Sequence, residues 1–181
     1  MKYFSIEELV KSATAERLTI DNTPPRAAQR MLTILVEQLL DPIRRRYGAP
    51  IIVTSGYRCP ALNTAVGGVA NSHHIVGCAA DITTGSIENN TMLFALIIDM
   101  QTTHAIRFTQ LIAEKDYRWL HISYVPGMLR NQIIDVNTQI NNDANVNVND
   151  NQPSGSQQLT SALSLEEKPS LTLKKDYQDS G

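Results

Sequence analysis

Residues 72–81 read Ser-His-His-Ile-Val-Gly-Cys-Ala-Ala-Asp, and they hold the densest group of chemically active side chains in the chain. His74 and Asp81 stand seven residues apart, and Gly77 between them permits a tight bend that turns both side chains toward one point. The small apolar residues around Asp81 predict a strand over residues 79–83. Taken alone, this spacing also fits a structural hydrogen-bonded pair.

A second segment supplies a third candidate ligand. Residues 119–123 read Trp-Leu-His-Ile-Ser, which predicts a strand whose Trp119, His121 and Ser123 share one face. Two His and one carboxylate, with a fourth position for water, form the ligand set of catalytic zinc sites. The chemistry then needs a general base near that water, and Glu114 or Asp116, in the turn before this strand, can supply it.

Working outward, a long helix is expected from Thr23 to Gly48. Thr23 is the expected N-cap, ahead of Pro24 in the first turn, and Gly48 is the expected C-cap. Apolar residues recur between them at helical spacing, and Pro42 is expected to kink the helix. The basic run Arg44-Arg45-Arg46 falls at the carboxyl end, where cations complement the helix dipole.

Short elements in mixed order make up the rest of the domain. Ser5 and Glu8 form a capping box that opens a first helix. Further helices are expected over residues 61–66 and 86–101, the latter with Met92, Leu93, Leu96 and Ile97 on one face. Strands are expected over 51–54 (buried), 79–83, 108–113 and 118–125. Because no strand–helix–strand unit repeats, this order favours an α+β fold with a mainly antiparallel sheet and flanking helices.

Charge and composition divide the chain near residue 130. Residues 1–130 hold 13 Lys and Arg against 11 Asp and Glu, whereas residues 131–181 hold 3 against 7. The second part is rich in Asn, Gln, Ser and Asp and has one aromatic residue, Tyr177. Such a segment buries too little apolar surface to offset its ordering entropy. We therefore expect a folded domain over 1–130 and a polar, acidic, disordered tail over 131–181.

Composition also excludes several classes of protein. No apolar run approaches the roughly 18 residues that span a bilayer, and the net charge of −2 argues against a nucleic-acid partner. Two cysteines, Cys59 and Cys78, are expected to be reduced. The amino-terminal residues lack the apolar run of a secretory signal, so we expect the protein to be made in the cytoplasm. We also expect it to be a monomer.

With these motifs in view, the sequence resembles the zinc D-Ala-D-Ala carboxypeptidase and L-alanyl-D-glutamate endopeptidase family, whose fold is shared with the Hedgehog signalling domain. The family pattern S-x-H-x-x-G-x-A-x-D is matched within residues 72–81, and W-x-H is matched by Trp119 and His121. Residues 54–63 resemble the family segment S-G-Y-R. The likeness covers about residues 1–125 and is greatest to the short branch common in phages and prophages.

The resemblance implies a role for each matched residue. His74, Asp81 and His121 would bind zinc, and Arg58 would stabilise the oxyanion formed when an amide is attacked. Ser72 would orient a ligand or the terminal group of the substrate. Glu114 would act as the general base.

Several residues near these motifs leave alternatives open. Many relatives place the catalytic carboxylate three residues before the last His, where this chain has Arg118, so Asp116 stays a rival to Glu114. Tyr57 and Trp119 are candidates to contact substrate, but either fits the core equally well. His73 is expected to point away from the metal.

The implied function is zinc-dependent hydrolysis of an amide bond in the peptide stem of peptidoglycan. Both D-Ala-D-Ala carboxypeptidase and L-Ala-D-Glu endopeptidase activities fit the motifs. Without an export signal, the protein would suit a phage or prophage lysis enzyme, released through a pore or carried on a virion to reach the cell wall. The alternatives are a non-catalytic zinc-bound module that binds cell wall or protein, and a phage structural protein anchored by this domain.

Overall fold

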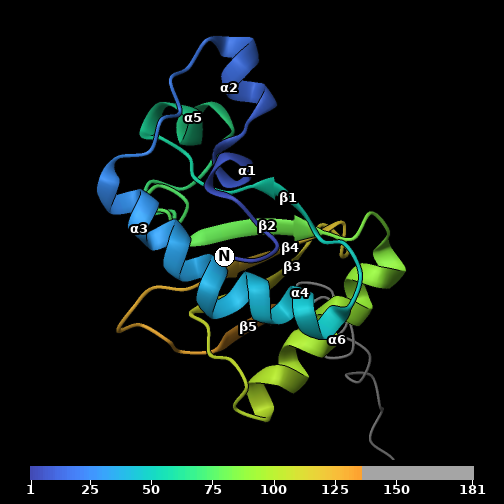
Figure 1. Cartoon of the computed structure of the whole chain (residues 1–181). Coiled ribbons are helices and arrows are strands. Elements are labelled where there is room, and N and C mark those ends of the chain that lie inside the picture. The colour runs from blue at the N-terminus through green and yellow to red at the C-terminus, as the bar shows by residue number, and fades with distance from the viewer. Residues whose placement is uncertain (136–181) are drawn as a thin grey trace, which may run out of the picture. The chain divides into compact units, whose positions relative to one another are not determined.

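Five strands form one sheet in the order β1-β2-β4-β3-β5 (Figure 1). The structure is a computed structural model and describes residues 1–135. All neighbouring strands are antiparallel except β3 and β5, which are parallel. The strands are β1 (Ile52–Ser55), β2 (Ala79–Thr83), β3 (Gln110–Glu114), β4 (Trp119–Ser123) and β5 (Gln132–Asp135). The expected α+β fold with a mainly antiparallel sheet is confirmed.

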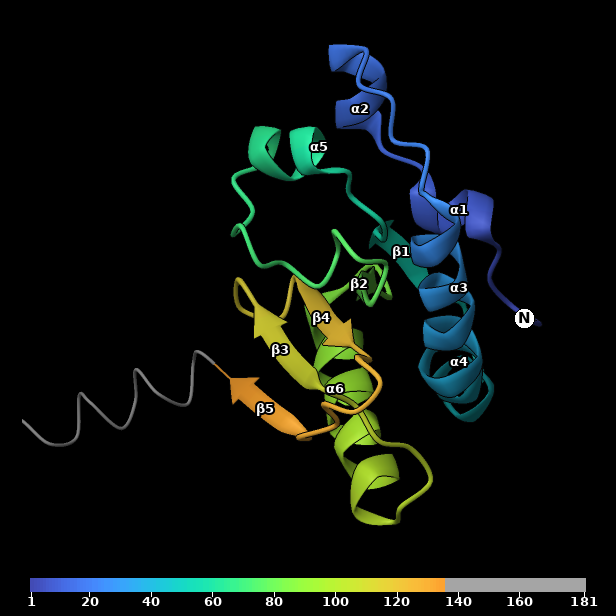
Figure 2. The ribbon, with the colours of Figure 1, turned by 90° about the vertical axis from the view of Figure 1, so that its left-hand side faces the viewer.

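Helices precede the sheet, interrupt it and cover one face of it. They are α1 (Ile6–Val10), α2 (Ala13–Leu18), α3 (Arg26–Leu35), α4 (Asp41–Tyr47), α5 (Pro60–Ala65) and α6 (Ile87–Thr102), with a π-helical segment, η1 (Val36–Leu40), between α3 and α4. Figure 2 shows α3 and α4 to one side of the sheet. None of the helices in residues 1–135 combines the length and apolar character needed to cross a bilayer.

The sheet register separates a core face from a polar face. Ala80, Ile122 and Leu111 lie side by side on β2, β4 and β3, and all three are buried in the hydrophobic core. Because side chains alternate along a strand, the intervening residues lie on the opposite face. There Asp81 pairs directly with His121, which in turn pairs with Ile112. The fold thus positions two candidate ligands by strand pairing alone.

The long helix differs from the expectation at its start and in its middle. Pro25, not Thr23, is the N-cap, so the expected cap was wrong by two residues. Pro42 has no N–H to donate to the carbonyl four residues back, and just before it the helix widens, with Asp41 N–H donating to the Val36 carbonyl. Gly48 ends α4 with φ of 80°, as expected.

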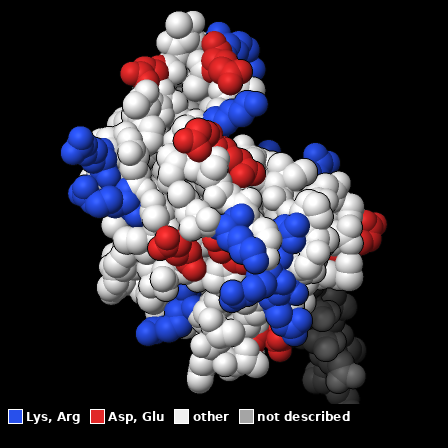
Figure 3. Space-filling model, in the orientation of Figure 1, with Lys and Arg blue, Asp and Glu red and all other residues white. Residues whose placement is uncertain are grey.

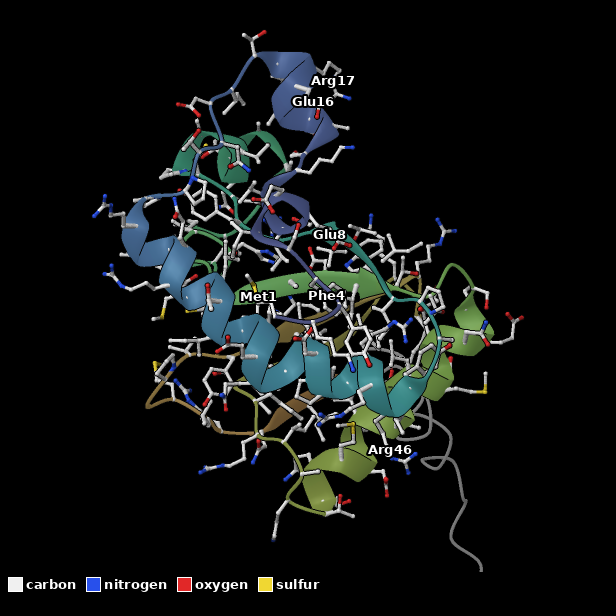
Figure 4. The ribbon with its side chains drawn as sticks, viewed as in Figure 1. Met1, Phe4, Glu8, Glu16, Arg17 and Arg46 are labelled. Atoms are coloured by element: carbon white, nitrogen blue, oxygen red, sulfur yellow. The ribbon has the colours of Figure 1, made fainter. Side chains whose placement is uncertain are left out.

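The amino-terminal residues lie against this helix, and the basic run forms its last turn. Phe4 is buried in the core, and the terminal amine of Met1 is 3.7 Å from Glu37 (Figure 4). Arg44, Arg45 and Arg46 occupy the last turn of α4, in agreement with the dipole argument. Figure 3 shows Lys and Arg side chains gathered over the region of α4.

Two apolar positions are more exposed than the sequence indicated. Ile52, expected in a buried strand, is 53% exposed because it lies opposite Thr83, on the sheet face that does not face the core. Met92 is 57% exposed, and Phe94 and Met100 are buried in α6 instead. Periodicity located both elements and placed Leu93 and Ile97 correctly in the core, but it misjudged the exposure of Ile52 and Met92. Cys59 and Cys78 are free, as expected.

The polar segment after residue 130 begins with a strand that composition did not indicate. β5 pairs with β3, and its entry is fixed by Asn131, whose backbone N–H donates to the Phe108 carbonyl and whose side chain accepts from the Phe108 N–H. Asp135 accepts a 2.6 Å hydrogen bond from the Tyr117 hydroxyl. The first residues of the expected tail therefore belong to the sheet. The rest of that segment, 136–181, lies outside the described residues.

Candidate metal centre

Three side chains converge on the polar face of the sheet. Asp81 Oδ1 lies 2.9 Å from His121 Nδ1 and 3.2 Å from His74 Nε2, and the two His nitrogens are 3.2 Å apart. Together these residues form a group able to hold a metal ion. Asp81 and His121 come from paired strands, whereas His74 comes from the loop before β2. This loop completes the site because Gly77, with φ of 75°, turns the chain between His74 and the strand.

The ring of His74 is oriented by the backbone of Gly56. His74 Nδ1 lies 2.6 Å from the Gly56 carbonyl, which can only accept a hydrogen bond, so Nδ1 carries the proton. Burial lowers the pKa of His74, with Asp81 opposing, which favours the neutral ring. The Nε2 lone pair then faces the carboxylate of Asp81. These two electron-rich groups repel each other unless a cation lies between them. The donor set therefore fits a metal ion.

Asp81 is held in its ionised form. Burial would raise its pKa, but the hydrogen bond with His121 leads the interactions that outweigh burial and hold the pKa of Asp81 far below its usual range. An ionised carboxylate beside two imidazole nitrogens is the ligand chemistry that zinc prefers.

Gly56 leaves no space for a side chain. A Cβ at this position would lie 2.1 Å from the Leu9 carbonyl oxygen, which accepts the Tyr57 N–H. We expect Gly56→Ala to lower the free energy of unfolding by about 3 kcal/mol and to weaken zinc binding, because the backbone that orients His74 must shift. Urea unfolding and a zinc titration measure both effects.

Gly85→Ala is the matched control for this substitution. A Cβ at Gly85 meets open space and adds only the strain of a φ of 94°. It should cost about 1 kcal/mol and leave zinc affinity unchanged. Wild-type stability and zinc affinity in Gly56→Ala would contradict the argument.

Arg58 lies at the edge of the metal-binding group. One of its terminal nitrogens is 3.9 Å from Asp81 Oδ2, and its backbone N–H donates to the His74 carbonyl. Burial lowers the pKa of Arg58, with Asp81 opposing this, and its Nε is buried without a partner in residues 1–135. Arg58 thus retains donor capacity for another group.

A cavity of about 500 Å³ opens beside the three converging side chains. Its lining includes His121 and three further residues that the motifs indicated: Arg58, Ser72 and Glu114. Glu114 reaches it because it lies opposite Trp119, one pair along the same sheet face from His121. Asp116 is not part of the lining; it lies in a turn where Lys115, Asp116 and Tyr117 all have positive φ.

The remaining candidates lie in different surroundings. Tyr57 is 5% exposed and packs in the hydrophobic core, which leaves it out of the cavity lining. Trp119 shares the polar sheet face, with the Lys115 ammonium over its ring, but it does not line the cavity. His73 lines the cavity, although its neighbour His74 supplies the converging nitrogen. Burial, followed by the charges of His121, His74 and Arg130, lowers the pKa of His73.

Sequence reasoning missed part of the cavity wall. Gln110, Arg130 and Gln132 line it as well, and none of them belongs to a motif. Arg130 and Gln132 flank the boundary where composition turns polar, so the sequence offered no signal that they would reach the site. Their position depends on the pairing of β5 with β3.

Comparison with known proteins agrees with this geometry. A model of the family described as Peptidase M15 matches residues 2–123, which contain the three converging side chains, Arg58 and Glu114. None of the curated proteins matches the chain significantly. Since the family match covers about two thirds of the 181 residues, the chain belongs to the peptidase M15 family, a family of zinc-dependent metallopeptidases.

Proposed function

We propose that the protein hydrolyses an amide bond in the peptide stem of peptidoglycan, with zinc held by His74, Asp81 and His121. The observation that carries the proposal is the convergence of these three side chains beside a cavity that also holds Glu114 and Arg58. A charged base, a charged donor and a metal-binding group in one cavity are the components of metal-assisted amide hydrolysis. Zinc, when bound, lowers the pKa of a water molecule and polarises the substrate carbonyl.

Glu114 is proposed as the general base. Its carboxylate takes the proton of the attacking water and passes that proton to the amine that leaves. Its place on the sheet face of His121, opposite Trp119, supports this role over Asp116.

Arg58 is proposed to bind the carbonyl oxygen of the cleaved amide as it becomes negative. Its guanidinium lines the cavity beside Asp81, and its terminal nitrogens supply donors for that charge. A fixed donor in a partly buried site stabilises developing charge more than it would in water. Ser72, whose hydroxyl accepts from the His74 N–H at 3.4 Å, would orient the ligand loop or the substrate end.

Incubating peptidoglycan with the purified full chain, with and without a chelator, tests this function. We expect new stem-peptide products in the mass spectrum, lost with the chelator and restored by zinc. Release of free D-Ala would identify a carboxypeptidase, whereas a new amino-terminal D-Glu would identify an endopeptidase. Zinc binding without cleavage of either bond would sink the proposal and favour a non-catalytic binding module.

The proposal extends to a role in phage lysis. It is supported by the resemblance to the short branch of the family that phages and prophages carry. In cells, we expect lysis when the protein is expressed together with a pore-forming holin. We expect no lysis when the chain is expressed alone.

A further inference from the structure

One wall of the cavity is built by residues that follow the family segment. Arg130 and Gln132 lie beyond the matched residues 2–123, yet both line the cavity together with His121. They reach it because β5 runs parallel to β3, with Gln132 opposite Gln110 and a 3.1 Å hydrogen bond from Gln110 Nε2 to Gln132 Oε1. This wall is therefore a place where the chain can differ from its relatives in specificity.

Arg130 brings an uncompensated positive charge to this wall. Its backbone N–H donates to the Met128 carbonyl, and the next residue, Asn131, is tied to Phe108 through both its backbone and its side chain. Within residues 1–135, the guanidinium forms neither an ion pair nor a hydrogen bond, although Glu114 lines the same cavity. A fixed backbone that presents a charge without a partner suits the binding of an anion.

The register of β3 gives the order of groups along the cavity. Gln110, Ile112 and Glu114 follow one another on the same face, and Ile112 lies opposite His121. Gln110 marks the end next to Gln132 and Arg130, and Glu114 marks the other end. Two residues of a strand span about 7 Å. The metal-binding group lies level with Ile112, so it is about one such step from Glu114 on one side and from the Gln110 end, where Arg130 lies, on the other.

We propose that Arg130 binds the free α-carboxylate of the substrate residue whose nitrogen is released by cleavage. This inference rests on the proposed function. In a terminal D-Ala-D-Ala bond, that residue is the last D-Ala, which ends in a carboxylate. In an L-Ala-D-Glu bond it is D-Glu, which continues the stem through its γ-carboxyl and keeps its α-carboxylate free. Both bonds thus present the same anion next to the cleaved nitrogen.

The covalent geometry of the substrate limits how far its α-carboxylate lies from the cleaved bond. The α-carboxylate carbon lies about 3–4 Å from the carbon of the cleaved amide, since they are separated by the nitrogen and one Cα. A charge-assisted hydrogen bond adds about 2.8 Å. The donor that binds this carboxylate therefore lies within about 7 Å of the cleaved carbon. Arg130 lines the same cavity as His121, at the end next to Gln110.

The test compares two stem pentapeptides on the zinc-loaded full chain. One carries the α-carboxylate beside the cleaved bond, and the other carries a carboxamide there. We expect kcat/KM to be at least tenfold higher for the carboxylate. Arg130→Gln should lower kcat/KM for the carboxylate about 10- to 100-fold, leave the carboxamide nearly unchanged, and so abolish the preference; Arg130→Lys should restore part of it. Arg45→Gln, the same charge change on exposed α4, should behave as wild type.

A binding measurement separates this inference from the proposed function. Calorimetry uses analogues whose cleavable amides are replaced by methylene-amine links, so that no turnover is needed. Tighter binding of the carboxylate analogue to wild type, lost in Arg130→Gln, would support the carboxylate site even if no peptide were cleaved. Two outcomes would overturn the inference. The first is that wild type shows equal kcat/KM for the carboxylate and carboxamide peptides and equal Kd for the two analogues. The second is that a folded Arg130→Gln protein loses as much kcat/KM on the carboxamide peptide as on the carboxylate peptide.

Discussion

Replacing Glu114 by Gln is expected to lower kcat on the stem peptide by about 100- to 10 000-fold while the protein keeps its zinc. Gln matches Glu in size but cannot take a proton from water, so the change removes the proposed base without opening a cavity. Glu114 lines the cavity on the sheet face of His121 but is not one of the three converging groups. Its replacement therefore tests the proposed proton transfer separately from metal binding. Single-turnover kinetics and metal analysis by mass spectrometry measure the two quantities.

Asp116→Asn is the matched control for that experiment. Asp116 lies in the β3–β4 turn with φ of 58°, a conformation that Asn adopts readily, so the fold should be preserved. We expect its kcat to stay within about twofold of wild type, because its carboxylate is not part of the cavity lining. Full activity in Glu114→Gln together with an inactive Asp116→Asn would transfer the role of base to Asp116.

The second large effect is expected from the loss of a proposed metal ligand, His74. His74 is 1% exposed and is held between the Gly56 carbonyl and Asp81. His74→Ala should abolish tight zinc binding. At zinc concentrations about a thousandfold above the wild-type Kd, it should therefore remove about 4 kcal/mol of stabilisation. Thermal unfolding with and without zinc tests this: the wild-type Tm should rise by about 10 °C with zinc, and the variant Tm should not respond.

Two further variants distinguish a loss of zinc binding from a folding defect. Asp81→Asn preserves the shape of the carboxylate and removes its charge, so it should also lose the response to zinc. His73→Ala removes the adjacent, half-buried imidazole and should keep the full zinc-dependent rise in Tm. A zinc response that disappears in His73→Ala and survives in His74→Ala would exchange the roles of the two residues.

Local sequence patterns predicted where helices and strands begin and end better than they predicted which neighbouring elements cover them. β2 begins and ends where the sequence indicated, because residues 79–83 carry both β-forming side chains and the motif that ends at Asp81. Met92 and Ile52 were misplaced because periodicity reports that a residue is apolar, but not whether a neighbouring element exists to cover it. β5 was missed because its two isoleucines lie in a segment that is polar on average, and because Asn131 and β3 provide the hydrogen bonds that make it a strand.

What the sequence determined by itself was the chemistry of the candidate site. The types and spacing of His74, Asp81 and His121 indicated a metal centre, since Gly77 and the strand alternation constrain where those side chains can point. The tertiary structure alone decided which other groups share the cavity. It placed Glu114 there and left Asp116 in a turn, it buried Tyr57 in the core, and it brought Arg130 to the far wall. The physical reason is that ligand motifs depend on local backbone geometry, whereas the neighbours of a cavity depend on strand register and pairing between segments distant in sequence.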